Sequence, residues 1–294
     1  MIRRFSFANA FIYFIFILLS ISILVPLWAV VSISLSDGQD IAKYGYQLIP
    51  RQWDWGAYIH IFEHPQGILE SYKVTAISTF LGTFLTVWMI SMCAYALSRR
   101  DFVYRKIITY FLFFTMLFSG GLVPTYILMT NYLHLQDTYA ALIIPLMGSV
   151  WFLLLMRTFF LQLPVELIEA AKIDGAREFR IYLRIIIPIS TPVFATVSML
   201  QLLGYWNSWM PALLYINDER LYPLQYLLQR ILRNVEELYM NLQMGMAVDA
   251  AQLANLPSES LRMAMAIVAI GPMLFVFMFF QRYFSKGLTV GSVK

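Results

Sequence analysis

Two sets of side chains in this 294-residue chain could carry a function. Between positions 164 and 184, acidic, basic and small residues follow one another in a pattern that suits ion pairs and close packing against another protein. Elsewhere, neutral polar residues stand in otherwise apolar stretches and could line a transport path. Any one of them is more often a hydrogen bond between helices than a ligand contact. They are Asn131, Gln201, Tyr205, Asn207 and Ser208.

The sequence lacks the groups that chemistry inside a membrane needs. No Asp, Glu, Lys, Arg or His stands in the middle of an apolar stretch, whereas proton- and ion-coupled transporters use such residues. The motifs HExxH, GxSxG and GxxxxGK(S/T) are also absent from the sequence. Two interpretations remain, a passive structural subunit and a transport path that another polypeptide powers. We expect no catalytic residue, no metal site and no cofactor bound by this chain.

The composition indicates that membrane helices position these residues. Hydrophobic residues make up 60% of the chain and charged residues 13%, about half of the roughly 25% typical of soluble domains. This composition excludes an ordinary cytosolic enzyme and a disordered chain. It also excludes a nucleic-acid-binding domain, because the net charge is only +4 despite an isoelectric point near 9.1. The single cysteine, Cys93, excludes a disulfide framework and a multi-cysteine metal site.

Six stretches without Asp, Glu, Lys or Arg are long enough, at about 20 residues, to cross a membrane. We therefore predict an all-α membrane protein with six transmembrane helices. Asp137 alone separates the third stretch from the fourth, which predicts a short turn. The first stretch is too long for the apolar part of a signal peptide, so we expect a retained helix. The stretches are Phe5–Ser36, Val74–Ser98, Ile107–Gln136, Thr138–Met156, Ile185–Asn217 and Met263–Gln281.

The basic residues predict the orientation. If the N-terminus is cytoplasmic and the spans alternate, the inner segments hold 14 of the 21 Lys and Arg residues but only 5 of the 17 acidic residues. Both termini are then cytoplasmic. We expect one transmembrane domain over residues 1–294, with long outer loops at 37–73 and 218–262. A charged segment at 164–184 and a tail at 282–294 lie on the inner side.

The charged segment 164–184 predicts a compact bent knob of two short helices. Pro164 suits a first helical turn, and Glu166 suits the positive end of a helix dipole. Ala171 and Gly175 are four apart and would let another surface come close, and the glycine indicates a bend. An amphipathic helix lying on the lipid surface is the alternative. The ion pairs expected from the spacing are Glu169 with Lys172 and Asp174 with Arg177.

The order of residues in this segment resembles the EAA motif of ABC-importer permeases. Glu169-Ala170-Ala171 is followed after three residues by Gly175, and after nine more by Ile185, Ile187 and Pro188. Asp174-Gly175-Ala176 and Pro192 extend the match over some 24 residues, although the family usually has leucine where Ile187 stands. The Trp206-Asn207 pair and the ending Phe284–Lys294 also resemble the maltose-type carbohydrate-uptake permeases, in particular the smaller permease of the branch that serves complex oligosaccharides, some containing uronates.

This resemblance implies a type I ABC importer permease in the bacterial cytoplasmic membrane, a multi-pass transport subunit without enzymatic activity. Its implied partners are a second homologous permease, two ATPase subunits that bind ATP and Mg, an extracellular or periplasmic sugar-binding protein, an oligosaccharide and the lipid bilayer, with no nucleic acid. The motif becomes a coupling helix docked in a cleft of the ATPase, with Asp174 capping the second helix. The implied contacts are Glu169, Ala170, Ala171, Asp174 and Gly175.

The same resemblance places the tail residues Lys286, Gly287, Leu288 and Gly291 between the ATPase subunits, although a frayed terminus is the usual alternative. Aromatic and amide side chains suit the hydroxyls and C–H faces of sugars, so the implied substrate path comprises Tyr205, Trp206, Asn207, Gln201 and Asn131. The outer loop 218–262 is expected to touch the binding protein or to pack as a lid on the bundle. Other hypotheses are a permease for a non-sugar solute and a membrane-embedded enzyme.

Overall fold

The computed structural model describes residues 7–63, 65–244 and 258–290, and in this part of the chain the regular elements are helices. One isolated antiparallel bridge joins Ser36 to Trp53. The chain divides into two compact units, and the prediction of a single transmembrane domain stays a prediction. The first comprises residues 1–68 and 228–271, and the second comprises residues 69–227 and 272–294.

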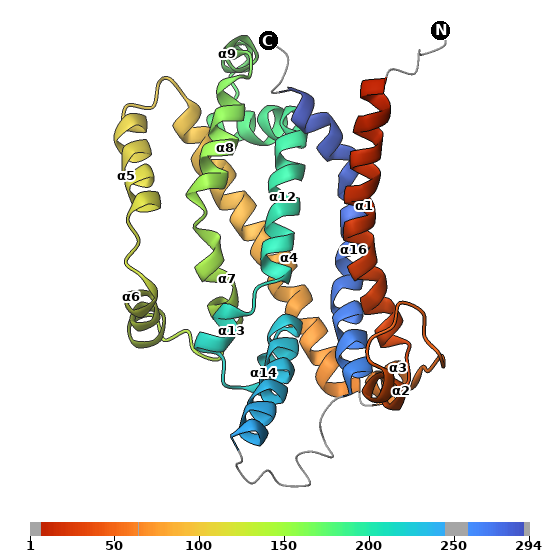
Figure 1. Cartoon of the computed structure of the whole chain (residues 1–294). Helices are drawn as coiled ribbons and strands as arrows, with labels where there is room; N and C mark the ends of the chain where they lie inside the picture. The colour runs from red at the N-terminus through yellow and green to blue at the C-terminus, as the bar shows by residue number, and fades with distance from the viewer. Residues whose placement is uncertain (1–6, 64, 245–257, 291–294) are drawn as a thin grey trace. The chain divides into compact units, whose positions relative to one another are not determined.

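The first unit is built around the long apolar helix α1 (Phe7–Ser34) (Figure 1). Its side chains from Phe11 to Trp28 are exposed although they are almost all apolar, as expected for a helix that faces lipid. The short helices α2 (Gly38–Tyr44) and α3 (Gly56–Glu63) follow it, which gives structure to the expected outer loop 37–73. The unit also contains most of α14 (Leu224–Gln243) and the first part of α16 (Glu259–Val290).

Small hydroxyl side chains tie this first unit together. Ser260 on α16 donates to the carbonyl oxygen of Ser36 at 2.7 Å, and Ser34 Oγ lies 2.9 Å from Tyr58 Oη. Ala57, Ile61 and Ala264 form a small buried cluster beside these bonds. Small residues at helix contacts let backbones approach closely, which is how helices associate where lipid removes the hydrophobic driving force.

The second unit is a bundle in which α4 (Pro65–Ser98) is the longest unbroken helix. The helix α8 packs against α5 and α12, and α7 packs against α12 and α13. The remaining elements are α5 (Arg105–Leu117), α6 (Leu122–Ile127), the π-helix η1 (Leu128–Tyr132), α7 (Tyr139–Met147), α8 (Val150–Leu161), α9 (Val165–Ile173), α10 (Glu178–Ile181), the π-helix η2 (Tyr182–Ile186), α11 (Ile187–Ile189), α12 (Thr191–Trp206), α13 (Met210–Tyr215) and the 3₁₀ turn η3 (Glu219–Leu221).

Three of the six predicted spans are single helices and three are bent. Within the described residues, α1, α4 and α16 are by length and composition able to cross a membrane alone. The pairs α5 with α6–η1, α7 with α8, and α10–α11 with α12 qualify only when each is counted as one span, and they bend by 111°, 53° and 83°. The breaks coincide with Gly120-Gly121, with Gly148, and with Ser190 between two prolines, because glycine is a poor helix former and proline lacks the backbone N–H that a helix needs.

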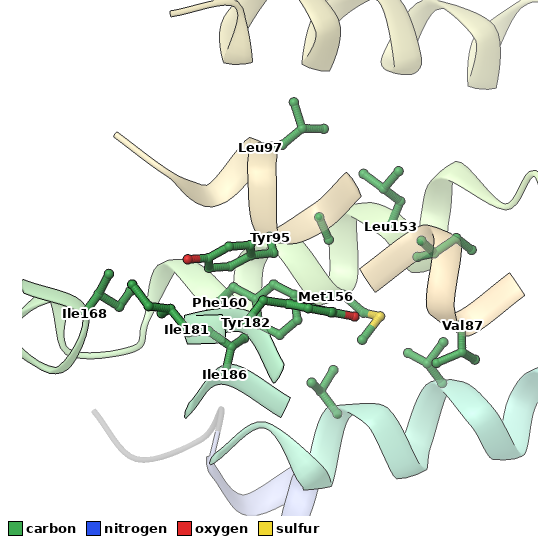
Figure 2. Close-up of a cluster of buried hydrophobic side chains, with 14 of the residues drawn as sticks. Val87, Tyr95, Leu97, Leu153, Met156, Phe160, Ile168, Ile181, Tyr182 and Ile186 are labelled. Atoms are coloured by element: carbon green, nitrogen blue, oxygen red, sulfur yellow. The ribbon is translucent and has the colours of Figure 1, made fainter. Parts of the chain in front are cut away.

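The main core of the second unit surrounds two tyrosine rings. Tyr95 on α4 and Tyr182 on η2 lie with ring centroids 5.6 Å apart. Figure 2 shows them between Ile168 and Ile181 on one side and Met156 on the other. All of these side chains are at least nine-tenths buried. The core thus contains Ile168 of α9, so the helix of the charged segment is packed onto the bundle.

A line of buried hydroxyl residues along α4 contacts other helices of the second unit. Thr86 Oγ1 lies 2.8 Å from Tyr205 Oη on α12, and Ser91 Oγ lies 2.6 Å from Tyr182 Oη. Thr75 Oγ1 accepts a hydrogen bond from the backbone N–H of Leu224 at 2.8 Å. The buried hydroxyl residues of α4 are Ser71, Thr75, Ser78, Thr79, Thr83, Thr86 and Ser91.

Candidate functional site

The segment that carries the motif folds as a short helix, a glycine bend and a second helix, as predicted. Pro164 precedes α9, and Glu166 lies in its first turn. At the other end, Gly175 N–H donates to the Lys172 carbonyl at 3.0 Å and Ala176 N–H to the Ala171 carbonyl at 2.9 Å. These two bonds define a Schellman cap, which needs a left-handed residue, and Gly175 has φ +77°. The glycine therefore fixes where α9 ends.

Four of the five residues predicted to contact an ATPase are exposed, namely Glu169, Ala170, Asp174 and Gly175. The fifth residue, Ala171, is 9% exposed and packs into the main core, so its side chain faces the bundle, and its contribution to an ATPase contact stays a prediction. Ala171 and Ile168 are three apart, so they share the face that α9 turns to the bundle. The small size of Ala171 thus permits close packing between α9 and the bundle.

Two local predictions in this segment are wrong. Asp174 does not cap the second helix; it is the C-cap residue of α9, and Arg177 precedes α10. Lys172 does not pair with Glu169, because its ammonium is drawn to two carboxylates that only the tertiary fold brings near. Lys172 Nζ lies 2.7 Å from Glu178 Oε1 and 3.0 Å from Asp101 Oδ2.

Tyr95, Asp101, Lys172 and Glu178 form one polar group, here called the Lys172 cluster. Besides the two contacts of Lys172, Tyr95 Oη donates to Glu178 Oε2 at 2.5 Å. The hydrogen bond from Lys172 lowers the pKa of the Asp101 carboxyl, and the hydrogen bonds to Glu178 and then Asp101 raise the pKa of the Lys172 ammonium. The cluster therefore joins the end of α4, α9 and α10 through charged hydrogen bonds.

A pocket of about 460 Å³ lies beside the Lys172 cluster. Its walls are mainly aromatic and aliphatic, and Arg99, Asp101 and Glu178 supply the charged groups. Arg157 Nε on α8 donates to the carbonyl of Leu97 at 3.1 Å, which holds α8 against the same end of α4. No sequence pattern connects α4 with the motif, because Asp101 and Glu178 are 77 positions apart and only the fold brings them together.

Ile173 lies in the segment 164–184 and is not among the contact residues that the sequence predicts. Its side chain is 87% exposed at the end of α9, next to the exposed Asp174 and Gly175. An aliphatic side chain so fully exposed beside small and charged residues suits insertion into a partner protein. The available sequence clue was an isoleucine between two charged residues, outside the packed face of the helix.

The structure buries three of the five residues predicted to line a substrate path and exposes the other two. Tyr205 and Trp206 are buried, and so is Gln201. Tyr205 Oη bonds Thr86 and also donates to the Ile143 carbonyl at 3.1 Å, while Trp206 packs on Leu202 and Met273. Asn207 and Asn131 are exposed; Asn207 donates to the Leu203 carbonyl at 2.9 Å, and the Asn131 side chain accepts a hydrogen bond from Thr130 at 3.0 Å.

Two further predicted regions have local structure in the described residues. Asp137 adopts φ +53°, and its carboxylate accepts the backbone N–H groups of Asp218 and Asn217, which lowers its pKa. This makes the predicted short turn a fixed contact with the chain after α13. The helix α16 continues to Val290, so Lys286, Gly287 and Leu288 lie on its last turns, and Gly291 lies outside the described residues.

Comparison with known proteins identifies the family. Residues 1–290 match the family described as binding-protein-dependent transport system inner membrane component. The polygalacturonan/rhamnogalacturonan transport system permease protein YtcP of Bacillus subtilis is 34% identical over 286 residues, covering 96% of each chain. Protein LplC of the same organism is 35% identical over 271 residues, covering 92% of this chain and 89% of LplC.

A solved structure supports the same assignment. A bacterial ABC transporter involved in the import of the acidic polysaccharide alginate contains a chain that is 27% identical, with a TM-score of 0.80 and coverage of 96% of this chain and 97% of that one. The present chain therefore belongs to the family of binding-protein-dependent transport system inner membrane components. It is a membrane permease subunit and not an enzyme, as the sequence predicted.

Proposed function

We propose that this permease imports an oligosaccharide, preferably one that contains uronate residues, and that a separate ATPase drives it through α9. Two relatives support the solute class, since one is a permease for polygalacturonan and rhamnogalacturonan and the other belongs to an alginate importer. The observation that carries the coupling proposal is the capped, exposed end of α9, where Glu169, Asp174 and Gly175 face solvent beside Ile173.

The chain would act in an assembly with a second homologous permease, two ATPase subunits and a sugar-binding protein in the bacterial cytoplasmic membrane. ATP and Mg would be bound by the ATPase subunits. ATP-driven closure of these subunits would move α9, and the bundle would change between inward-facing and outward-facing packing. Glu169 and Asp174 would make the charged contacts, and Ala170 and Gly175 would permit close approach. The last turns of α16, with Lys286, would lie near the same ATPase subunits.

The outer segment that contains α14 is our candidate contact for the binding protein. The helix carries buried Leu224 and Val235 on one side, and its exposed face ends with Met240. Exposed methionine suits an adaptable contact surface. Photo-crosslinking from Asn241 to a sugar-binding protein would support this contact, and failure of crosslinking during active transport would favour a lid packed on the bundle.

The solute class is tested by uptake in proteoliposomes that contain the whole assembly and internal ATP. Labelled digalacturonate, a neutral disaccharide and glycerol 3-phosphate are supplied with the binding protein. We expect uptake of the uronate sugar. The alternative of a non-sugar solute has one specific support, a 30% identical sn-glycerol-3-phosphate permease of Pectobacterium atrosepticum. Uptake of glycerol 3-phosphate without uptake of either sugar would refute the sugar proposal.

A further inference from the structure

The Lys172 cluster connects the helix α9 to a part of the bundle that lies far away along the chain. Lys172 is on α9, Glu178 opens α10, and Asp101 follows the end of α4. In Figure 1, α9 lies at the end of the second unit where α4 and α8 also end. We propose that this cluster is a positioning device that holds α9 on α4, so that α4 carries the movement of α9 into the bundle. The inference rests on the proposed function in that a partner ATPase moves α9.

The covalent route from α9 to α12 is poorly suited to carry movement. It passes the glycine bend at Gly175, the π-helix η2 and the 83° break at Ser190. Each interruption breaks the regular run of α-helical backbone hydrogen bonds that makes a helix stiff. A displacement of α9 that followed the chain alone would be partly absorbed at three joints before it reached α12.

The helix α4 offers a stiffer route. It is unbroken over 34 residues, which corresponds to roughly 50 Å at about 1.5 Å per residue. Its hydroxyl groups contact Tyr182 near one end, Tyr205 further along and the backbone of Leu224 near the other end. Movement delivered to the Asp101 end of α4 therefore acts on each of these contacts together.

The apolar contacts of α9 do not fix its position by themselves. A helix of 9 residues is too short to be stable alone, and only Ile168 and Ala171 are buried. Apolar contact is non-directional, so it permits sliding and rotation over the core. The hydrogen bonds of Lys172 to two separate carboxylates, at 2.7 and 3.0 Å, remove that freedom because they are directional and charged.

Because the Lys172 cluster is exposed, its loss should affect the position of α9 more than the folding stability of the chain. The side chains of Lys172, Glu178 and Asp101 are 39%, 48% and 57% exposed. Ion pairs at such exposure add little to folding stability. Removing Lys172 should therefore leave the bundle folded and the ATPase bound, and change how well movement is transmitted.

The test compares uptake with ATP hydrolysis in proteoliposomes that contain the complete assembly. Lys172→Met keeps the length of the side chain and removes its charge, and Lys172→Arg keeps the charge. Glu166→Gln removes a charge from the exposed first turn of α9 and is the matched control. We expect Lys172→Met to lower the uptake per ATP by about fivefold or more while hydrolysis stays within about twofold. Lys172→Arg and Glu166→Gln should keep the normal ratio.

A second pair of variants replaces the cluster with a covalent link. In a Cys93→Ser background, Lys172→Cys together with Asp101→Cys should lower the ratio, and a short bifunctional thiol reagent that bridges them should restore it. An unchanged ratio in Lys172→Met, or a bridge that fails to restore it, overturns the inference. Equal loss of uptake, hydrolysis and ATPase co-purification also overturns it, since that pattern indicates a structural role. If the unmodified assembly transports no solute, the proposed function fails as well.

Discussion

Gly175 allows the sharpest test of how the motif works, because the structure separates strain from contact. No atom outside its immediate chain neighbours lies within 4 Å of the position that a Cβ would occupy. A new side chain would therefore meet no clash within the chain. Its effects arise from the backbone, which has φ +77°, and from whatever partner covers the residue.

The backbone effect can be estimated from the left-handed conformation. A residue with a Cβ in this conformation costs roughly 1–2 kcal/mol relative to glycine, and asparagine tolerates it better than alanine does. Opening of the Schellman cap should thus become about 5 to 30 times more frequent in Gly175→Ala. The expected readout is faster hydrogen exchange of the Ala176 amide, which bonds the Ala171 carbonyl in the native cap.

The contact effect is isolated by comparing two side chains of the same shape. Gly175→Asn and Gly175→Asp have similar backbone strain, but only aspartate adds a charge to the surface that would meet the ATPase. We expect Gly175→Asn to keep most of the uptake and Gly175→Asp to abolish it, with both proteins inserted in the membrane at normal levels. Normal uptake by Gly175→Asp would refute the coupling role, and unchanged exchange in Gly175→Ala would refute the strain argument.

Three more predictions test the packing and charge of the second unit. Gly82→Ala would place a Cβ 2.7 Å from the Tyr205 ring, so we expect a loss of about 1–3 kcal/mol of folding stability. The measurement is the thermal unfolding temperature in detergent, which should fall. An unchanged temperature would contradict this packing. Asp137→Ala removes the acceptor for two exposed backbone N–H groups and should lower stability by about 0.5–1.5 kcal/mol, whereas Asp137→Asn should lose less. Equal losses would count against these bonds. The Asp101–Lys172 pair should stay intact between about pH 5 and 9. The pKa of Asp101 is lowered, so the stabilisation from its carboxylate is lost only as the pH falls through that lowered pKa. The pKa of Lys172 is raised, so the stabilisation from its ammonium is lost only as the pH rises through that raised pKa. A fall in uptake per ATP between these two limits would contradict the pair.

The buried hydroxyl residues of α4 join helices of the bundle, a role that their positions in the sequence do not reveal. Amide and aromatic residues such as Gln201 and Tyr205 stand out in apolar stretches, and their chemistry predicts a substrate path. The structure buries Tyr205 between α4 and α7, where its hydroxyl bonds Thr86 and the Ile143 carbonyl. The clue was present in the regular spacing of Ser and Thr along residues 71–91, but spacing shows that residues share a face without showing what the face meets.

The sequence alone determined the features that depend on local chemistry. Long apolar stretches predict spans because the lipid interior admits no charge, and Pro164, Glu166 and Gly175 predict the two ends of α9 because they act through neighbouring backbone groups. The tertiary structure alone decided which face of α9 is free, that Lys172 binds Asp101 and Glu178, and that Tyr205 joins helices. These outcomes depend on contacts between residues far apart in the chain, and a charge or a hydroxyl takes the partner that the fold brings nearest.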